Sequence, residues 1–377
     1  MKRSRLRCAL GLILLAGCQG GKPSPPPPPS PEPSATQNDR SPTTNVAEAD
    51  DAQAVAALEA IAAVLKRDGE GFVTEVNFRG TSVDDAALTH LLGLRRLRSV
   101  TLAETPVTDA GLATLGTVTA LQTVDLRECK ITNEGLQHLA GLTSLRSLRL
   151  SGKNGGTTVD DEGLAALAKL TQLKVLGLDF LWVSEQGLGT LGELKGLEEL
   201  YLAQTLIDDA SLATLALFPR LKKLRIAKTQ VTSEGLAHVP KLAQLEELDL
   251  SECSQLDDAG LAHLAGMTPL TRLNLWRVPI GDAGVARLAG LINLQWLNLD
   301  NTLLTDAGLE SLAGMNRLAF LHLGSTAVSD AGLHHLESLT ALKDLKVTRT
   351  PVTADGVTAL KKKLPDTEIQ LQYIEGQ

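Results

Sequence analysis

The chain has 377 residues and a formal net charge of −8, from 36 Lys and Arg against 44 Asp and Glu. This acidic excess argues against a surface that grips phosphate groups by charge, so we expect no nucleic-acid partner. Apolar residues make up 43% of the chain but aromatic residues only 3%, as in cores built from repeated Leu, Val and Ala. Four Cys in so long a chain exclude a disulfide-held scaffold.

The first residues have the layout of an export signal. A basic start, MKRSRLR, precedes a short apolar run that ends in LAGC at residues 15–18. The run is too short to span a bilayer. The tetrapeptide resembles the lipobox of bacterial lipoproteins, which implies a signal peptide over residues 1–17 and a lipid attached to Cys18. An ordinary signal peptide that ends in Cys by chance is the alternative.

A Pro-rich segment follows, and residues 18–45 hold nine of the sixteen prolines. Such segments are extended, at about 3.1 Å per residue, so we interpret this one as a linker between a lipid anchor and a folded domain. A lipid on Cys18 predicts a membrane-anchored protein of the cell envelope. Gln19 follows the lipid site, and by resemblance to envelope sorting rules the absence of Asp there favours the outer membrane.

A helical cap is expected over residues 46–72. Apolar residues recur at helical spacing between Asp51 and Lys66, and they include Leu58, Ile61 and Leu65. Because an open stack of repeats needs its ends covered, we predict that this helix covers the first repeat. At the other end, residues 366–377 form the second cap, in which the sequence TEIQLQY predicts a final strand after three lysines at a helix end.

The chain repeats itself from residue 73 to residue 365. Nine of eleven successive intervals are 24 residues long, and the others are 28 and 25. Apolar residues recur at positions 1, 4, 6, 11, 16 and 19 of each unit. Position 1 is held by Val73, Leu97, Leu121, Leu145, Leu173, Leu197, Leu221, Leu245, Leu270, Leu294, Leu318 and Leu342.

One unit, from Leu97, reads LRSVTLAETPVTDAGLATLGTVTA. The pattern L-x-x-L-x-L-x-x-T/C-x-V, continued as T-D-A-G-L, resembles the bacterial leucine-rich repeat proteins with 24-residue units. The resemblance implies an α/β fold, a leucine-rich repeat solenoid or horseshoe of about twelve repeats. Its parallel sheet would form the concave side and short helices the convex side. Such horseshoes are commonly interaction scaffolds.

The residues of a unit predict the same elements. Positions 4 and 6 alternate with outward positions 3, 5 and 7, which is the period of a strand. Position 12 is Asp, Ser or Thr in eleven of twelve units, as a helix N-cap requires, and Asp at position 13 suits the positive helix end. Position 15 is Gly, Ala or Ser throughout, which indicates a spot without room for a larger side chain.

Position 9 is Thr or Cys in most units, and this predicts a ladder of side chains bonded to the backbone of the turns. Cys129 and Cys253 belong to this ladder. They lie five units apart, too far for a disulfide, so we interpret them as structural thiols.

No catalytic motif stands out. There is no P-loop, nucleophile elbow, dinucleotide fingerprint or zinc helix. Five of the seven histidines occupy position 18, on the expected convex helices, so a metal role is not expected for them. The sequence predicts a protein that is not an enzyme and has no cofactor.

The concave positions carry charges and aromatic rings. Acidic and basic pairs alternate on three successive units at residues 198–199, 222–223 and 246–247, and the simplest interpretation is a self-paired surface ladder. Exposed aromatic residues beside Arg are typical of binding hot spots, although rings that pack only on one another are the alternative. The candidate binding residues are Trp276, Trp296, Phe320, Arg272, Arg277, Asp300 and His322, with a second cluster of Phe180, Trp182 and Tyr201 beside a longer loop at residues 152–156.

These features predict an envelope-anchored scaffold that binds another protein on its concave face, as a monomer. The alternative is a module that binds cell-wall or extracellular glycans by stacking sugars on the concave aromatic rings. The fold alone does not decide between them.

Overall fold

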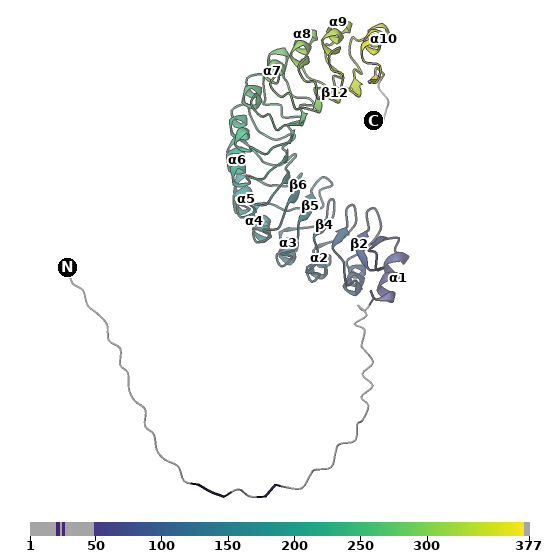
Figure 1. Ribbon diagram of the computed structural model, residues 1–377, viewed down its shortest axis with the longest axis vertical. Helices are drawn as coiled ribbons and strands as arrows, with labels where there is room; N and C mark the ends of the chain where they lie inside the picture. The colour runs from purple at the N-terminus through teal and green to yellow at the C-terminus, as the bar shows by residue number, and fades with distance from the viewer. Residues whose placement is uncertain (1–19, 23–24, 27–48, 373–377) are drawn as a thin grey trace, which may run out of the picture. The chain divides into compact units, whose positions relative to one another are not determined.

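The structure is a computed structural model that describes residues 20–22, 25–26 and 49–372 (Figure 1). The predicted signal peptide, the Cys18 lipid site and most of the Pro-rich linker lie outside these residues. The chain divides into two units, Met1–Ala47 and Glu48–Gln377, and the second unit contains the repeats. None of the described helices has the length and apolar character needed to cross a membrane.

One sheet runs through the described part of the second unit, with its strands in chain order. All neighbouring strands from β2 onward are parallel, and β1 alone pairs antiparallel with β2. The strands are β1 Val64–Arg67, β2 Val73–Asn77, β3 Ser99–Thr101, β4 Thr123–Asp125, β5 Ser147–Ser151, β6 Val175–Asp179, β7 Glu199–Tyr201, β8 Lys223–Arg225, β9 Glu247–Asp249, β10 Arg272–Asn274, β11 Trp296–Asn298, β12 Phe320–His322, β13 Asp344–Lys346 and β14 Glu368–Gln370.

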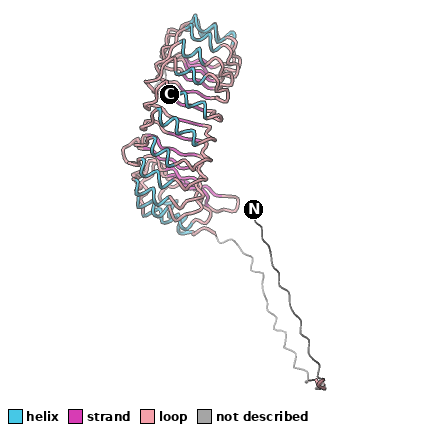
Figure 2. Tube along the Cα trace, turned by 90° about the vertical axis from the view of Figure 1, so that its left-hand side faces the viewer, coloured by secondary structure: helices cyan, strands magenta, loops and turns pink. Residues whose placement is uncertain are grey.

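Short helices alternate with these strands. They are α1 Ala52–Ala60, α2 Asp109–Leu115, α3 Asn133–Leu139, α4 Asp161–Leu164, α5 Glu185–Thr190, α6 Asp209–Thr214, α7 Asp282–Arg287, α8 Asp306–Leu309, α9 Asp330–Leu333 and α10 Ala354–Lys363, with 3₁₀ helices η1 Ala86–Gly93, η2 Ala165–Leu167, η3 Leu215–Leu217, η4 Gly235–Lys241, η5 Gly260–Leu264, η6 Glu310–Leu312 and η7 His334–Leu336. The helices line the outer side of a curve and the strands its inner side (Figures 1 and 2). The predicted solenoid of twelve repeats, β2 to β13, is confirmed.

The predicted apolar positions form the core. In the unit that starts at Leu97, all six apolar positions are at most 1% exposed, and the same holds for five of the other eleven units. Strand residues alternate as predicted, with a buried centre between two half-buried neighbours, as in β11 and β12. The predicted N-caps are also present, since Thr108 and Thr132 accept hydrogen bonds from the backbone in the first turns of α2 and α3.

The N-terminal cap differs from the prediction. The helix α1 begins after its N-cap Asp51 but ends at Ala60, and the chain then reverses through Ala62, which has a positive φ of 59°. Leu65, which we placed on the helix, lies in β1 and pairs with Val76. This antiparallel strand uses the open edge of β2, so the cap is a helix followed by a hairpin. The predicted C-terminal strand is confirmed as β14.

A contact between position 13 of one unit and positions 12 and 15 of the next joins successive units. Oδ1 of Asp109 accepts from the backbone N–H of Thr132 at 3.0 Å, and Oδ2 accepts from the Thr132 hydroxyl at 2.6 Å. A Cβ added to Gly135 would overlap Oδ1 of Asp109. The lack of room at position 15 is therefore confirmed, and its cause is the carboxylate of the preceding unit. Seven other glycines face an Asp carboxylate in the same way, namely Gly111, Gly187, Gly235, Gly284, Gly308, Gly332 and Gly356, while Gly163 faces the amide oxygen of Asn133.

One junction breaks this pattern. Glu185 stands at position 13, and its longer side chain accepts from the hydroxyl of Thr214 instead. The next unit has Ser211 at position 15 in place of Gly. The Ser211 hydroxyl accepts from the backbone N–H of Asp208, the group that position 13 serves in most other units. Ser211 is completely buried, so the hydroxyl fills the space that an Asp carboxylate would occupy.

The position 9 ladder is confirmed. The Thr105 hydroxyl donates to the carbonyl of Leu102 at 2.7 Å, within its own turn. Cys129 donates from Sγ to the same carbonyl at 3.1 Å, so its thiol bonds across to the neighbouring unit. Cys129 and Cys253 are free and buried, and burial raises the pKa of both thiols.

Position 8, in the turn that follows each strand, has a left-handed backbone that the sequence analysis missed. Ten non-glycine residues hold it, including Glu104, Lys228 and Arg349, with φ between 52° and 62°. Their N–H groups continue the ladder, as where Lys228 donates to the carbonyl of Ser251 at 2.8 Å. The sequence feature that could have predicted this conformation is the absence of Val, Ile and Thr from position 8. Residues branched at Cβ are the least compatible with positive φ.

We expect Lys228→Gly to raise the free energy of unfolding by about 1 kcal/mol, because Gly adopts positive φ without steric cost. The matched change Gln230→Gly, at an exposed position two residues later with no positive φ, should lower it. Urea unfolding of both variants measures the difference. Destabilisation by Lys228→Gly would contradict this account of the turn.

Candidate functional site

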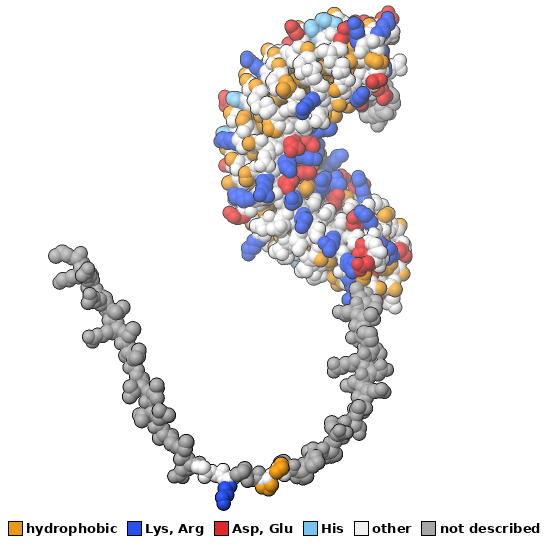
Figure 3. Space-filling view, in the orientation of Figure 1, with side chains coloured by type: hydrophobic (Ala, Val, Ile, Leu, Met, Phe, Trp, Pro, Cys, Tyr) orange, Lys and Arg blue, Asp and Glu red, His pale blue; other side chains and the backbone are white. Residues whose placement is uncertain are grey.

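The concave face is formed by the outward residues of the strands. Each short strand presents its first and third residues, at unit positions 3 and 5, and the second residue after it often adds position 7. Successive units stack in register, so each position forms a row across the sheet, as where Arg272, Trp296 and Phe320 are neighbours in one row. Acidic and basic side chains gather in the inner curve (Figure 3).

The predicted charge ladder is confirmed on β7 to β9 and the residues just before them. Glu198 lies between Lys174 and Lys222, at 2.7 and 3.2 Å. Lys223 lies between Glu199 and Glu247, at 3.5 and 3.2 Å. The bonds to the two lysines hold the pKa of Glu198 below its ordinary value, and the bond to Glu247 raises the pKa of Lys223. These groups neutralise one another, so they offer little unpaired charge to a ligand.

A second ionic group lies in the next row. Arg225 contacts Asp179 at 3.0 Å and Asp249 at 3.3 Å. Burial raises the pKa of Asp179, although Arg225 acts in the opposite direction. Tyr201 belongs to the same region, since its hydroxyl donates to Glu199 at 2.7 Å and its ring lies 5.2 Å from the guanidinium of Arg149. Burial is the main reason why the pKa of Tyr201 is raised.

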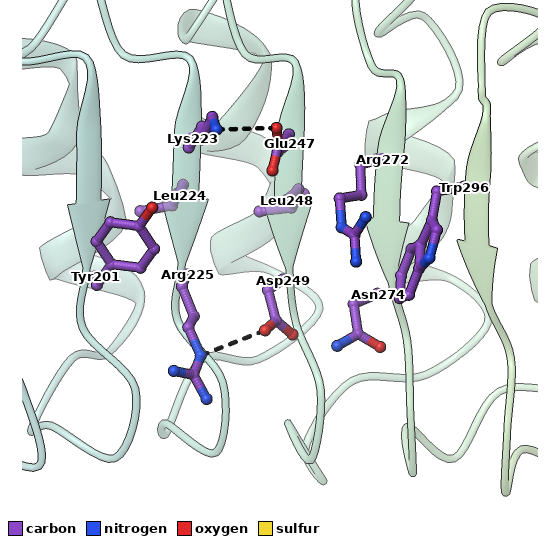
Figure 4. A pocket seen from close by; sticks show the side chains of 10 residues that line it. All are labelled: Tyr201, Lys223, Leu224, Arg225, Glu247, Leu248, Asp249, Arg272, Asn274 and Trp296. Carbon is purple, nitrogen blue, oxygen red and sulfur yellow. Dashed lines mark ion pairs between the residues drawn. The ribbon is translucent and has the colours of Figure 1, made fainter. Parts of the chain in front are cut away.

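A first hollow of about 140 Å³ lies over β7 to β11. Tyr201 lines one end and Trp296 the other, with two ion pairs between them, Lys223–Glu247 and Arg225–Asp249 (Figure 4). Arg272 and Asn274 line the end near Trp296. The small volume and the ion pairs make this a shallow polar depression.

The aromatic residues of β11 and β12 are packed on each other. The rings of Trp296 and Phe320 are stacked, with centroids 4.9 Å apart and planes within 6°. The guanidinium of Arg272 lies 3.7 Å from the Trp296 centroid, and His322 meets Phe320 edge-on at 6.4 Å. We call Arg272, Trp296 and Phe320 the aromatic stack. Arg272 and Phe320 cover the faces of the Trp296 indole. A sugar ring would therefore have to displace one of them to stack on Trp296.

A second hollow of about 430 Å³ lies beside the stack, toward the carboxyl ends of β10 to β14. It is lined by Trp276, Arg277, Asp300, His322 and Lys346, among other residues. The Arg277 guanidinium lies 5.4 Å from the Trp276 centroid and 3.3 Å from a carboxylate oxygen of Glu252. Burial lowers the pKa of His322, so this imidazole is neutral at pH 7. The structure thus brings all seven residues of the first predicted cluster to the aromatic stack or the second hollow.

The second predicted cluster is not assembled in this way. Trp182 is 66% exposed and lies outside the strands, in a bridge with Asp160. Phe180 occupies the left-handed turn at position 8, and Tyr201 is engaged on the concave sheet. Ring contacts among the described residues do not join these three side chains. The longer loop packs against the turn of Phe180, since a Cβ on Gly152 would overlap the Phe180 carbonyl.

Lys346 is the residue that the sequence analysis missed. Its ammonium lies 5.8 Å from the Phe320 centroid, and it lines the second hollow. The sequence could have predicted this placement, because Lys346 stands at position 5 of the unit after that of His322. The two residues are neighbours in the sheet register. Within the described part of the chain, no three His, Cys, Asp or Glu side chains are grouped to hold a metal ion.

Comparisons with known proteins agree with this fold. The profile of the Leucine Rich repeat family matches residues 119–140. The crystal structure of an internalin from Listeria monocytogenes is similar with a TM-score of 0.60 at 19% identity, covering 87% of this chain and 96% of that one. The yeast Rad7 and Elc1 complex contains a chain that is similar with a TM-score of 0.51 at 19% identity, covering 76% of this chain and 83% of that one. No curated protein gave a significant sequence match.

Proposed function

With a leucine-rich repeat solenoid as the premise, we propose that this protein is a non-catalytic scaffold that binds another protein on the concave face of β10 to β14. The observation that carries the proposal is that the charged side chains of this face form ion pairs in one part and not in another. The charged groups of β7 to β9 are paired with one another, whereas Arg272 and Lys346 make no ion pair within the described residues. Aromatic residues and Arg beside a hollow are the composition of binding hot spots.

Two further points support a protein ligand. A chain of similar fold occurs in a complex with another protein in the yeast structure of Rad7 and Elc1. The concave rows of β10 to β13 present side chains along about 14 Å of surface, which suits an extended segment or a folded partner. The glycan alternative is weaker at this site, because the faces of Trp296 are taken by Arg272 and Phe320.

The place of action remains part of the proposal. We infer from the LAGC tetrapeptide that Cys18 carries a lipid and holds the repeats at the cell envelope, at the outer membrane. Cys18→Ser should leave a protein that no longer partitions into the detergent phase and takes up no labelled fatty acid. Continued labelling of that variant would exclude Cys18 as the lipid site.

Site-specific crosslinking in intact cells tests the binding face. A photoreactive amino acid at Asn298, half-buried on β11, should give a discrete protein adduct, because it lies among the concave rows. The matched position is Ala286, exposed on the convex helix α7, and it should give none. Adducts from Ala286 alone would place the binding face on the helices. Binding of purified envelope polysaccharide that Trp296→Ala abolishes would favour the glycan alternative.

A further inference from the structure

The aromatic stack is flanked by two cations that make no ion pair, although Glu247 is the neighbour of Arg272 in its row and Asp300 lines the second hollow together with Lys346. The guanidinium of Arg272 lies over one face of Trp296, and the ammonium of Lys346 lies on the far side of Phe320. Neither side chain forms an ion pair with any residue that the structure describes. Every other basic side chain on strands β5 to β9, namely Arg149, Lys223 and Arg225, has a carboxylate partner. Among the basic residues of the described strands, the two cations at the stack are therefore an exception.

Arg272 is held in place without using its hydrogen bonds. Stacking at 3.7 Å on Trp296 fixes the plane of the guanidinium, and no side-chain hydrogen bond of Arg272 occurs among the described residues. A planar guanidinium with its N–H groups unused matches a carboxylate, which can accept two parallel hydrogen bonds from it. Asn274 beside it already accepts from the backbone N–H of Trp276, so its oxygen does not compete for Arg272.

The spacing of the two cations fits an extended chain. Arg272 lies 3.7 Å from the Trp296 centroid, the two ring centroids are 4.9 Å apart, and Lys346 lies 5.8 Å from Phe320. These distances keep the two charges within about 14 Å of each other, which is the length of about four residues of extended chain. In such a chain residues i, i+2 and i+4 point to the same side. The middle one would lie over the Trp296–Phe320 stack.

We propose that the aromatic stack binds an extended acidic segment of the partner protein in which two carboxylates stand four residues apart with an apolar residue midway between them. One carboxylate pairs with Arg272, the apolar side chain packs on the edges of Trp296 and Phe320, and the other carboxylate pairs with Lys346 beside the second hollow. This inference rests on the proposed function and names the chemistry of the partner.

Acidic side chains beyond Phe320 determine which row of the sheet the bound segment can follow. Asp344 is the neighbour of Phe320 in the row of position 3, and Glu368 follows it. An acidic segment that continued along this row would meet both carboxylates. Lys346 lies one row away, at position 5, so the segment crosses from one row to the next after Phe320. Removal of the Asp344 charge should therefore strengthen binding.

Synthetic peptides and the full-length chain test this inference. The first peptide has the core Glu-Thr-Leu-Thr-Glu, and the second contains the same residues with the two glutamates only two apart. A third has Lys in place of both glutamates. We expect the first peptide to bind at least about tenfold more tightly than the other two, measured by calorimetry and by Trp fluorescence. Equal binding of the first two peptides would overturn the spacing, and binding of the third would overturn the charge.

Variants of the chain locate the contact. Arg272→Met and Lys346→Met should each weaken the first peptide by about tenfold, and Asp344→Asn should strengthen it. Arg287→Met, which removes an exposed charge from the convex helix α7 of the same unit as Arg272, should change nothing. Arg272→Lys keeps the charge but not the planar fork, so it should fall between wild type and Arg272→Met, and thermal melting checks that each variant is folded. If Arg287→Met weakened binding of the first peptide as much as Arg272→Met does, the peptide would be attracted by basic side chains in general rather than by these two residues, and the proposed site would be wrong.

The peptide and crosslinking experiments distinguish a failure of this inference from a failure of the proposed function. If no peptide binds but crosslinking from Asn298 still gives a protein adduct, the acidic-segment inference is wrong and the concave scaffold stands. If the crosslinking also fails at Asn298 and succeeds at Ala286, the proposed function fails too.

Discussion

Gly135→Ala should lower the free energy of unfolding by about 2–4 kcal/mol, a large effect for one methyl group on a surface helix. The added Cβ would overlap Oδ1 of Asp109, which accepts the backbone N–H of Thr132. Either Asp109 turns away and leaves that N–H without its partner, or the two units move apart. The higher helix propensity of Ala offsets at most about 1 kcal/mol of this cost.

The matched control is Gly141→Ala, in the turn after α3, where an added Cβ would have no atom within 4 Å. It should leave the unfolding midpoint almost unchanged. Chemical denaturation of both variants measures the difference. If the two variants were equally stable, the contact between Asp109 and Gly135 would not hold the units together.

The junction at Glu185 and Ser211 predicts how to repair the damage. There a longer acid at position 13 goes with a hydroxyl at position 15, and Ser211 serves the backbone N–H of Asp208. Gly135→Ser combined with Asp109→Glu should therefore recover much of the stability that Gly135→Ser alone loses. A double-mutant cycle measures this coupling, and simple additivity of the two changes would contradict it.

The repeat made most of the fold predictable from the sequence. Apolar residues at fixed unit positions define both the strand and the helix, so the core and the parallel sheet followed from the period. The end of the N-terminal helix could not be predicted from the sequence, because Leu65 suits a buried position on either a helix or a strand. What separates them is the left-handed turn at Ala62, and Ala gives no local signal for positive φ.

The candidate site was only partly predictable, for a related reason. Trp296 and Phe320 share position 3 of adjoining units, so the sequence alone placed them together, and the structure confirms the contact. The sequence could not tell that Arg272 would cover the open face of Trp296, because this depends on a side-chain rotamer. Lys346 was overlooked because its unit has no aromatic ring of its own on the concave face.

Trp276 and Trp296, equivalent in the sequence analysis, should now behave differently. Trp296 is held between Arg272 and Phe320, and such contacts stabilise by about 1–2 kcal/mol together. Trp296→Ala should therefore lower the melting temperature by several degrees. Trp276 lines the second hollow with one cation nearby, at 5.4 Å, so Trp276→Ala should leave the melting temperature nearly unchanged.

Both substitutions should weaken binding of the partner captured from Asn298, Trp276→Ala by at least about tenfold and Trp296→Ala by about thirtyfold or more, as at hot spots that lose about 2 kcal/mol. The loss is larger for Trp296 because its removal also frees Arg272 from its fixed plane. Trp182→Ala is the control, since this ring is 66% exposed and lies away from the concave strands. Titration of the purified partner against the three variants measures the losses. If only Trp182→Ala weakened binding, the site would lie at the rim near Phe180, and the stack would be a purely structural contact.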